Sequence, residues 1–277
     1  MNEIFLKRIE GILPASALEH FGRPNQRIYL RINTLKTSFD QLNAQLKMLA
    51  LDVKTLEDFA NVLSVPAEQA RTILDSNLVA EGLLYPQGLE SIKAVLELDP
   101  QPGEMILDLC AAPGSKTSQI AALMNNEGIL VANEPIRARF YRLKSVLELT
   151  GAKATLSMVD GRRFRVKEQL FDRILVDAPC SSEGRFKYDN PKSYAYWNLR
   201  KIKEMAHKQK GLLLNASRLL KPGGVLVYST CTFAQEENEE VVDWFAKKSQ
   251  SMQFQSMQRI YPDGRMEGFF IAKWHKI

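Results

Sequence analysis

The chain has 277 residues, of which 45% are hydrophobic and 25% charged, and its formal net charge is +5. This composition is that of an ordinary globular protein with a sizeable core, and it excludes collagen-like and low-complexity architectures. No apolar run approaches the length of a membrane span, and the first 22 residues mix charge into their apolar positions, unlike a signal peptide. We therefore expect a cytoplasmic protein with no membrane partner.

The positive charge is concentrated in two clusters. Residues 1–80 hold nine basic and nine acidic side chains. Residues 137–167 hold nine basic against two acidic side chains, and residues 185–210 hold eight against two. Together the clusters predict a polyanionic partner, although a solvated helix face explains either cluster alone equally well.

Residues 1–80 are predicted to form a small α/β domain. Residues 27–33 (RIYLRIN) are typical of a strand, and residues 38–50 have the apolar spacing of a helix. Residues 66–74 (PAEQARTIL) predict a helix with Pro66 in its first turn. The stretch SNLVAEGLLYPQG interrupts these periodicities, which places the domain boundary near residue 80.

Residues 81–277 are predicted to form a doubly wound α/β domain. Short apolar, β-branched runs alternate with helix-like segments, which indicates a parallel sheet covered on both faces. A final strand is suggested by FFIAKW near the end of the sequence. The expected strands are 105–110, 129–134, 154–160, 172–179 and 225–230, and the helix-like segments are 116–124, 136–150 and 197–220.

Polar residues follow the predicted strands, at the sheet edge where such folds bind ligands. The turn DLCAAPGSKTSQ contains Gly114 but matches neither a dinucleotide fingerprint nor a P-loop. Glu134, Asp160 and Asp177 end the next three strands, and Glu134 lies where an acid can meet ribose hydroxyls. An adenosyl compound without phosphates, such as S-adenosylmethionine, fits this pattern. Each acid taken alone is better explained as a helix cap, and it is the occurrence of three acids at successive strand ends that favours a ligand pocket.

Each of the three cysteines, Cys110, Cys180 and Cys231, follows a strand-like run. Their odd number and wide spacing argue against a disulfide framework. The three histidines show no ligand spacing, so we expect no metal. A small buried hydrophobe is the ordinary role of a lone cysteine, and we assign that role to Cys110.

The motifs LDLCAAPGSKT, VDAPCSSEG and YSTCTFAQEENEEVV occur in this order. With LRINTLK, LYPQGLESI, LKPGGVLVYSTC and YPDGRMEGFFIAKW, they are distributed along nearly the whole chain. In these motifs the sequence resembles the NOL1/NOP2/Sun (RsmB-like) family of RNA cytosine-5 methyltransferases. The resemblance implies a Rossmann-like, S-adenosylmethionine-dependent catalytic domain at 81–277 and RNA contact by the small domain at 1–80.

The resemblance also implies a role for each cysteine of the paired motifs. Cys231 would be the nucleophile that adds to C6 of cytosine, because a thiol adduct turns C5 into a carbon nucleophile. Cys180 would assist product release, and Asp177 would contact the cytosine ring. The cofactor would bind residues of the first turn and the strand-end acids: Ala111, Ala112, Pro113, Gly114, Ser115, Lys116, Glu134, Arg139, Asp160 and Asp177.

Two positions depart from the family pattern. Ser115 stands where the family usually has glycine, and Thr232 where serine is common. A hydroxymethyl group at position 115 narrows the expected cofactor loop, which bears on affinity more than on activity.

The segment 185–210 interleaves basic and aromatic residues, a pattern typical of contacts to unpaired RNA. The expected partner is ribosomal RNA, slightly favoured over transfer RNA. One alternative is a DNA cytosine-5 methyltransferase, against which Ser181 after Cys180 and the second thiol both argue. Another is a catalytically inactive RNA-binding or assembly protein, which predicts missing thiols or an eroded cofactor loop.

Overall fold

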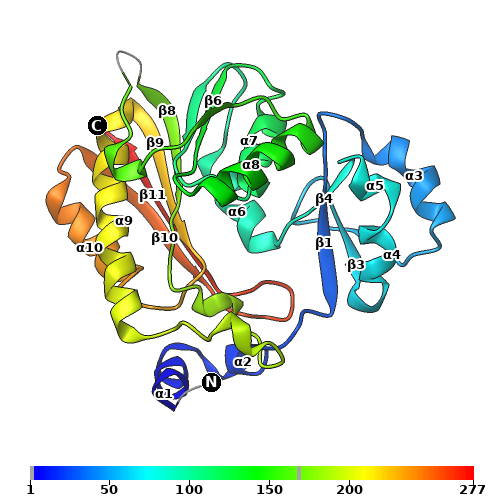
Figure 1. Cartoon of the computed structure of the whole chain (residues 1–277), viewed down its shortest axis with the longest axis horizontal. Helices are drawn as coiled ribbons and strands as arrows, with labels where there is room; N and C mark the ends of the chain where they lie inside the picture. The colour runs from blue at the N-terminus through cyan, green and yellow to red at the C-terminus, as the bar shows by residue number, and fades with distance from the viewer. Residues whose placement is uncertain (1–2, 167–169) are drawn as a thin grey trace. The chain divides into compact units, whose positions relative to one another are not determined.

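The computed structural model describes residues 3–166 and 170–277. Its contacts divide the chain into two compact units (Figure 1). One unit consists of Asn25–Asp160, and the other combines Met1–Pro24 with Gly161–Ile277. The domain boundary near residue 80 stays a prediction about domain organisation.

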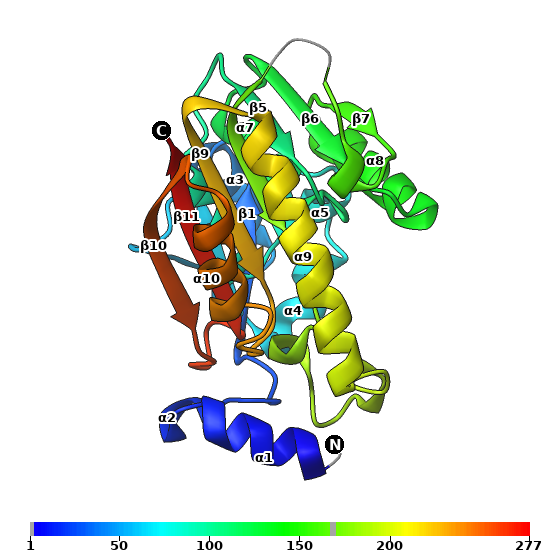
Figure 2. The ribbon, with the colours of Figure 1, turned by 90° about the vertical axis from the view of Figure 1, so that its left-hand side faces the viewer.

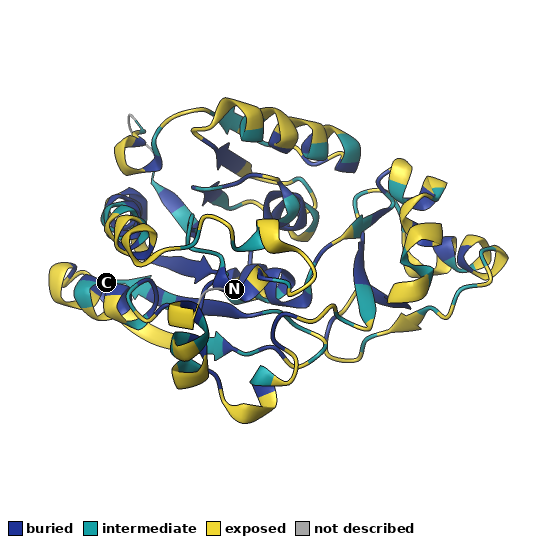
Figure 3. Cartoon of the chain, turned by 60° about the horizontal axis from the view of Figure 1, so that its bottom comes forward, coloured by how far each residue is buried: buried dark blue, intermediate teal, exposed yellow. Residues whose placement is uncertain are grey.

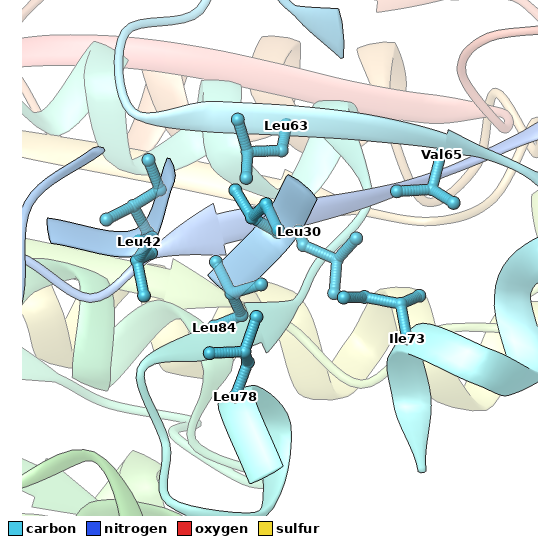
Figure 4. Close-up of a cluster of buried hydrophobic side chains, with 9 residues drawn as sticks. Leu30, Leu42, Leu63, Val65, Ile73, Leu78 and Leu84 are labelled. Atoms are coloured by element: carbon cyan, nitrogen blue, oxygen red, sulfur yellow. The ribbon is translucent and has the colours of Figure 1, made fainter. Parts of the chain in front are cut away.

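The unit Asn25–Asp160 contains an antiparallel four-stranded sheet of order β2-β3-β1-β4. One face of this sheet packs on short helices through a cluster of buried aliphatic side chains, including Leu30, Leu63 and Leu84 (Figure 4). The elements are β1 (Arg27–Ile32), α3 (Phe39–Met48), β2 (Lys54–Thr55), β3 (Val62–Pro66), η1 (Ala67–Gln69), α4 (Ala70–Leu74), α5 (Asn77–Ala80) and β4 (Leu84–Pro86).

Two residues of the RINTLK stretch anchor this sheet to the rest of its unit. Asn33 Nδ2 donates to the carbonyls of Gly82 and Thr150, and Lys36 Nζ donates to those of Glu81 and Leu149. Gly82 has a φ of +69°, and a Cβ there would overlap the Leu149 carbonyl, so glycine is required. The stretch therefore has a structural role within the unit.

The same unit contains three parallel strands, with β6 paired to both β5 and β7. Their helices follow the strands in alternation, as the sequence predicts. The elements are α6 (Leu89–Leu98), β5 (Met105–Asp108), α7 (Ser115–Leu123), β6 (Ile129–Asn133), α8 (Arg137–Thr150) and β7 (Thr155–Ser157).

The other unit is built on four strands of order β10-β11-β9-β8. β8 and β9 are parallel, whereas β11 is antiparallel to both β9 and β10. Helices α9 and α10 lie side by side over one face of these strands (Figure 2). The elements are η2 (Gly161–Arg163), β8 (Phe171–Asp177), η3 (Glu183–Arg185), η4 (Pro191–Ser193), α9 (Leu199–Leu219), β9 (Leu220–Thr230), α10 (Glu239–Lys248), β10 (Met252–Ile260) and β11 (Phe269–Lys276).

The N-terminal helices α1 (Glu3–Ile12) and α2 (Ala15–Leu18) belong to this second unit. Phe5, Ile9 and Phe21 pack on Phe186 and Phe233, which lie in the loops after β8 and β9. In Figure 3 most strands are buried, whereas the helices carry many exposed residues. Among the residues that the structure describes, no helix combines the length and apolarity needed to cross a membrane.

The structure corrects two details of the element predictions. Pro66 does not lie in a helix: it pairs with Arg27 as the last residue of β3, and the helical turns begin at Ala67. Strand β10 was not predicted from the sequence. It is an edge strand with a mostly exposed surface, so its side chains do not alternate between apolar and polar.

Candidate active site

The turn predicted to hold the cofactor lies between β5 and α7, in the unit Asn25–Asp160. Ala111 and Ala112 are buried, and Gly114 has a φ of +114°. A Cβ at Gly114 would approach Val146 to 3.0 Å, so the position favours glycine on both counts. Pro113 lies inside the turn, and Ser115 and Lys116 begin α7, with Lys116 buried.

The carboxylate of Glu134 lies at the end of β6 and is buried. Its Oε1 accepts a hydrogen bond from the Ile136 amide at 2.9 Å, and its Oε2 lies 3.5 Å from Arg139 Nε. Arg139 Nη2 also donates to the Ala112 carbonyl at 2.8 Å. Arg139 thus links the predicted ribose carboxylate to the predicted cofactor turn.

Asn133 connects the ends of three parallel strands, a role that the sequence analysis did not assign. Its Nδ2 donates to the carbonyls of Leu109 and Val159, at 3.1 and 3.0 Å, and its Oδ1 accepts from the Val159 amide at 3.1 Å. The turn after β5, Glu134 and the partly buried Asp160 are therefore gathered at one edge. In the sequence, the only sign of this role was an asparagine directly before the strand-end acid.

The other unit brings two of the three cysteines into contact. The sulfur atoms of Cys180 and Cys231 lie 3.3 Å apart, on the loops that follow β8 and β9. These strands are parallel neighbours with Asp177 paired to Ser229, and the Ala178 amide donates to the Ser229 carbonyl. The thiols meet because both loops leave the same end of the sheet.

The two thiols differ in their ionisation. The pKa of Cys231 is lowered to about 6, chiefly by a hydrogen bond from Cys180 and further by the Arg185 charge and the Ser182 hydroxyl. The pKa of Cys180 is raised well above its ordinary value by its pairing with Cys231 and by burial. The pair therefore holds a thiolate at Cys231 and a protonated thiol at Cys180 near neutral pH.

Charged groups surround the thiol pair. The positive charge of Arg185 faces Cys231, Asp177 and Cys180, and these raise the pKa of its guanidinium. Asp177 is the last residue of β8, and its Oδ1 accepts a hydrogen bond from Ser229 Oγ at 2.7 Å. The three residues assigned to catalysis, Asp177, Cys180 and Cys231, therefore lie together in this unit.

Cys110 belongs to the unit Asn25–Asp160 and is only partly buried. The sequence predicted a buried hydrophobic residue at this position, and that prediction is wrong in the degree of burial. Cys110 lies in the turn two residues after β5 ends. No group of three or more metal-ligating residues occurs within 3–166 or 170–277.

The structure separates the aromatic residues of segment 185–210 into buried and exposed ones. Phe186 is buried, and Trp197 packs edge-on against Phe5 while its Nε1 donates to Glu183 at 2.8 Å. Tyr196, in contrast, is 89% exposed, and Tyr188 is 51% exposed. Trp197 is thus a packing residue, and Tyr196 presents its ring to solvent. In the other basic segment, 137–167, Lys167 lies outside the described residues.

Two buried carboxylates beside the thiols were not predicted. Glu183 and Glu237 are both fully buried, and burial raises the pKa of each, that of Glu237 to about 7. The sequence did contain a signal, because acidic residues follow each cysteine motif within a few positions. An acidic side chain seldom lies in a core unless it is paired. The stretch AQEENEE contains four glutamates, so the sequence alone does not show which of their side chains is buried.

A profile of the family described as "16S rRNA methyltransferase RsmB/F" matches residues 95–275. The chain is 36% identical over 307 residues to a ribosomal RNA small subunit methyltransferase F of Vibrio vulnificus, across 100% of this chain and 64% of that protein. It is 47% identical over 169 residues to a tRNA (cytosine(49)-C(5))-methyltransferase of Pyrococcus abyssi, across 61% of this chain and 54% of that protein. The chain therefore spans less than two thirds of the length of these relatives.

Solved structures of similar fold cover the whole chain. A methyltransferase homolog protein from Pyrococcus horikoshii matches with a TM-score of 0.82 at 28% identity, over 100% of this chain and 96% of that one. The structure of NSun6 from the same organism matches with a TM-score of 0.88 at 23% identity, over 99% and 98%. These likenesses confirm the predicted α/β fold class with a Rossmann-like methyltransferase domain.

Proposed function

The chain belongs to the RsmB/F family of 16S rRNA methyltransferases, and from that premise we propose that it methylates C5 of cytosine in RNA. The membership confirms the family resemblance of the sequence motifs. The proposal is carried by one observation: the Cys180 and Cys231 sulfurs are 3.3 Å apart, with the pKa of Cys231 lowered to about 6. A thiolate held ready at neutral pH is the nucleophile that addition to a pyrimidine ring requires.

In the proposed mechanism, the Cys231 thiolate adds to C6 of cytosine, forming a C–S bond and moving electron density towards N3 and C5. Asp177 contacts the ring at N3, where a hydrogen bond or proton favours this addition. C5 thereby becomes nucleophilic and accepts the methyl group. The C5 proton is then lost to solvent, its electron pair forms the C5–C6 double bond, and the C6–S bond breaks with its electrons returning to Cys231 as a thiolate. Cys180 assists this release as the neighbouring thiol.

We propose that the unit Asn25–Asp160 binds S-adenosylmethionine, which supplies the methyl group when bound. Several observations support the fit. Small side chains line the turn at Ala111 and Ala112, and Gly114 adopts a φ that other residues resist. Glu134 is oriented by the Ile136 amide and by Arg139 to meet ribose hydroxyls. The remaining cofactor contacts proposed from the sequence in this unit are Pro113, Ser115 and Lys116 of the turn and Asp160 for adenine. The sequence also proposed Asp177, which belongs to the other unit.

The exposed aromatic and basic side chains of segment 185–210 are proposed to contact the RNA. Tyr196 stands out because its ring is almost fully exposed three residues before α9, whose first turn carries Arg200 and Lys201. An exposed ring beside cations can stack on an unpaired base. Such a base must leave its helix before a thiol can reach C6.

Ribosomal RNA is the substrate class that we propose first, because the family description and the relatives matched over nearly the whole chain name it. Transfer RNA is the second candidate, favoured by the relative that is 47% identical over 169 residues. The test is transfer of labelled methyl from S-adenosylmethionine to unmodified ribosomal RNA, transfer RNA and DNA, followed by nucleoside analysis. Label in 5-methylcytidine supports the proposal, and label in DNA alone would favour the deoxycytidine alternative.

A further inference from the structure

Two buried carboxylates join the loops that carry Cys180 and Cys231. Glu183 lies three residues after Cys180, and Glu237 lies six residues after Cys231. Both side chains have no exposed surface. Each one turns away from its own loop and bonds the other loop, so that the arrangement is reciprocal.

Glu183 leaves the Cys180 loop and binds the residues directly after Cys231. Its Oε2 accepts hydrogen bonds from Thr232 Oγ1 at 3.0 Å and from the Phe233 amide at 3.2 Å. Its Oε1 accepts the Trp197 indole N–H at 2.8 Å, and Arg8 Nε lies 4.0 Å away. Both carboxylate oxygens are therefore engaged, one of them wholly by the Cys231 loop.

Glu237 follows the Cys231 loop and binds the residues on either side of Cys180. Its carboxylate accepts the Ser181 amide at 3.0 Å and Gln209 Nε2 at 2.8 Å. The same Gln209 nitrogen donates to the Pro179 carbonyl at 3.0 Å. Cys180 is thus held from both of its neighbours, one directly and one through Gln209.

Direct bonds between the two loops complete the arrangement. Ser181 Oγ and Thr232 Oγ1 are 2.7 Å apart, and because Thr232 donates its proton to Glu183, Ser181 is the donor of this pair. The Gly184 amide donates to the Cys231 carbonyl at 3.0 Å. The separation of the two sulfurs is therefore fixed by a closed set of hydrogen bonds.

Burying two carboxylates is costly, and an apolar pair of similar volume would hold two loops together as well. What the carboxylates add is direction, because each accepts bonds only from groups at defined positions. Here the defined groups are the immediate neighbours of the two thiols. We propose that Glu183 and Glu237 are positioning residues that hold Cys180 and Cys231 in thiol contact, an inference that rests on the proposed function for the roles of the cysteines.

The test measures alkylation of Cys231 by iodoacetamide as a function of pH, with peptide mass spectrometry, in the free protein without RNA or cofactor. The variants are Glu183→Leu and Glu237→Leu, which remove both acceptor oxygens at similar volume, and the matched control is Glu240→Leu, which makes the same change at an exposed position on α10. Separation of the thiols removes the Cys180 hydrogen bond, so the alkylation midpoint should rise from about 6 towards 8. Such a rise lowers the thiolate fraction at pH 7 about tenfold.

The direction in which the alkylation midpoint shifts distinguishes a loss of positioning from the mere loss of a negative charge. Removing a negative charge near a thiol, with the loops unmoved, would leave the midpoint unchanged or lower it. An unchanged or lowered midpoint in both folded leucine variants would overturn the proposal. If these variants fail to fold, Thr232→Val removes one donor to Glu183 at nearly constant volume and without a charge change. A midpoint in folded Thr232→Val equal to that of Glu240→Leu would overturn it equally.

A second readout links positioning to the reaction. In methyl transfer, both leucine variants should lower kcat about tenfold while the dissociation constant for S-adenosylmethionine stays within twofold of wild type. The alkylation assay uses neither RNA nor cofactor. A raised midpoint with no methyl transfer in the wild-type protein would therefore sink the proposed function and leave the positioning role standing.

Discussion

The sulfur of Cys180 lies 3.3 Å from the sulfur of Cys231, and this contact gives the two thiols opposite ionisation. A proton shared between neighbouring thiols settles on one of them. The Arg185 charge and the Ser182 hydroxyl both favour the anion at Cys231, so the proton stays on Cys180. The two cysteines, each following a parallel strand, thereby differ in the way that the proposed mechanism requires of a nucleophile and a release group.

The first prediction concerns product release. In Cys180→Ala the nucleophile remains but the neighbouring thiol is lost, so the covalent complex with ordinary substrate RNA should accumulate. Denaturing gel electrophoresis should show an RNA–protein band that is absent from wild type and from Cys110→Ser, the matched control for the third cysteine. Absence of this band, with methyl transfer retained in Cys180→Ala, would remove Cys180 from the release step.

The pH dependence of the covalent step follows from the ionisation of Cys231. The thiolate is the deprotonated form, so a pKa lowered to about 6 keeps it populated above pH 6 and depletes it below. Single-turnover adduct formation should therefore rise through pH 6 and level off near pH 7. The hydrogen bond from Cys180 is the largest cause of the lowered pKa, so Cys180→Ala should move the profile to higher pH.

Arg185→Gln should move the same profile in the same direction, by about half a pH unit. The shift is smaller because the Arg185 side chain is exposed and water screens its charge. A profile with its midpoint near 8.5, the ordinary value for a free thiol, in wild type would contradict this account of the thiol pair.

Tyr196 and Trp197 are adjacent in sequence and should behave differently when mutated. Tyr196→Ala should weaken RNA binding by roughly 5- to 150-fold, since stacking of a base on an aromatic ring contributes about 1–3 kcal/mol. Its melting temperature should not change, because the ring is 89% exposed. Tyr196→Phe retains the aromatic face and should retain the affinity, as measured by filter binding or fluorescence anisotropy.

Trp197→Phe, in contrast, should lower the free energy of unfolding by about 1–3 kcal/mol, because it leaves buried Glu183 without the indole donor. Equal RNA affinities for Tyr196→Ala and wild type would exclude a stacking role for this ring.

Glu134→Gln tests the cofactor side of the site. Replacing the carboxylate by an amide of equal size weakens a charge-assisted hydrogen bond to the ribose, so the dissociation constant for S-adenosylmethionine should rise about tenfold or more. Calorimetry gives this constant directly. Glu148→Gln, on the exposed face of α8 within the same unit, is the matched control. An unchanged dissociation constant in Glu134→Gln would show that Glu134 does not bind the ribose.

Glu237 should make stability depend on pH. In the folded protein its carboxyl group keeps a proton up to about pH 7, because burial raises the pKa, whereas in the unfolded chain it loses the proton near pH 4.5. Between these values the folded state binds more protons, so stability should fall as pH rises. Glu183, also buried with a raised pKa, adds a contribution of the same sign.

The measurement is chemical denaturation of wild type and Glu237→Gln at several pH values from 4.5 to 7. Because glutamine does not titrate, the variant should lose less stability than wild type across this window. Parallel curves for the two proteins would mean that Glu237 is ionised throughout.

Much of this organisation was predictable from the sequence, for identifiable physical reasons. Strands β5, β6, β8 and β9 were found because buried parallel strands are continuous apolar runs, and strand-end acids follow them. Edge strand β10 was missed because its exposed side chains follow no period. The thiols were recognised from their motifs, but their different ionisation depends on the 3.3 Å contact and on Arg185.

The carboxylates Glu183 and Glu237 could not be distinguished from their acidic neighbours. Glu236 and Glu240 stand beside Glu237 in the sequence, and only the fold shows which side chains turn inward. The packing of helix α1 within the unit that holds the thiols could not be predicted either, since it depends on contacts between Phe5 and residues nearly 200 positions away.

The central claim is covalent attack by Cys231 on cytosine in RNA, and trapping with 5-fluorocytidine-substituted RNA tests it most directly. Fluorine at C5 blocks the release step, so the adduct should persist through denaturation in the presence of S-adenosylmethionine. Protease digestion and mass spectrometry should then locate the nucleotide on Cys231, and Cys231→Ala should form no adduct. A nucleotide found on Cys180, or an adduct that survives in Cys231→Ala, would contradict the account.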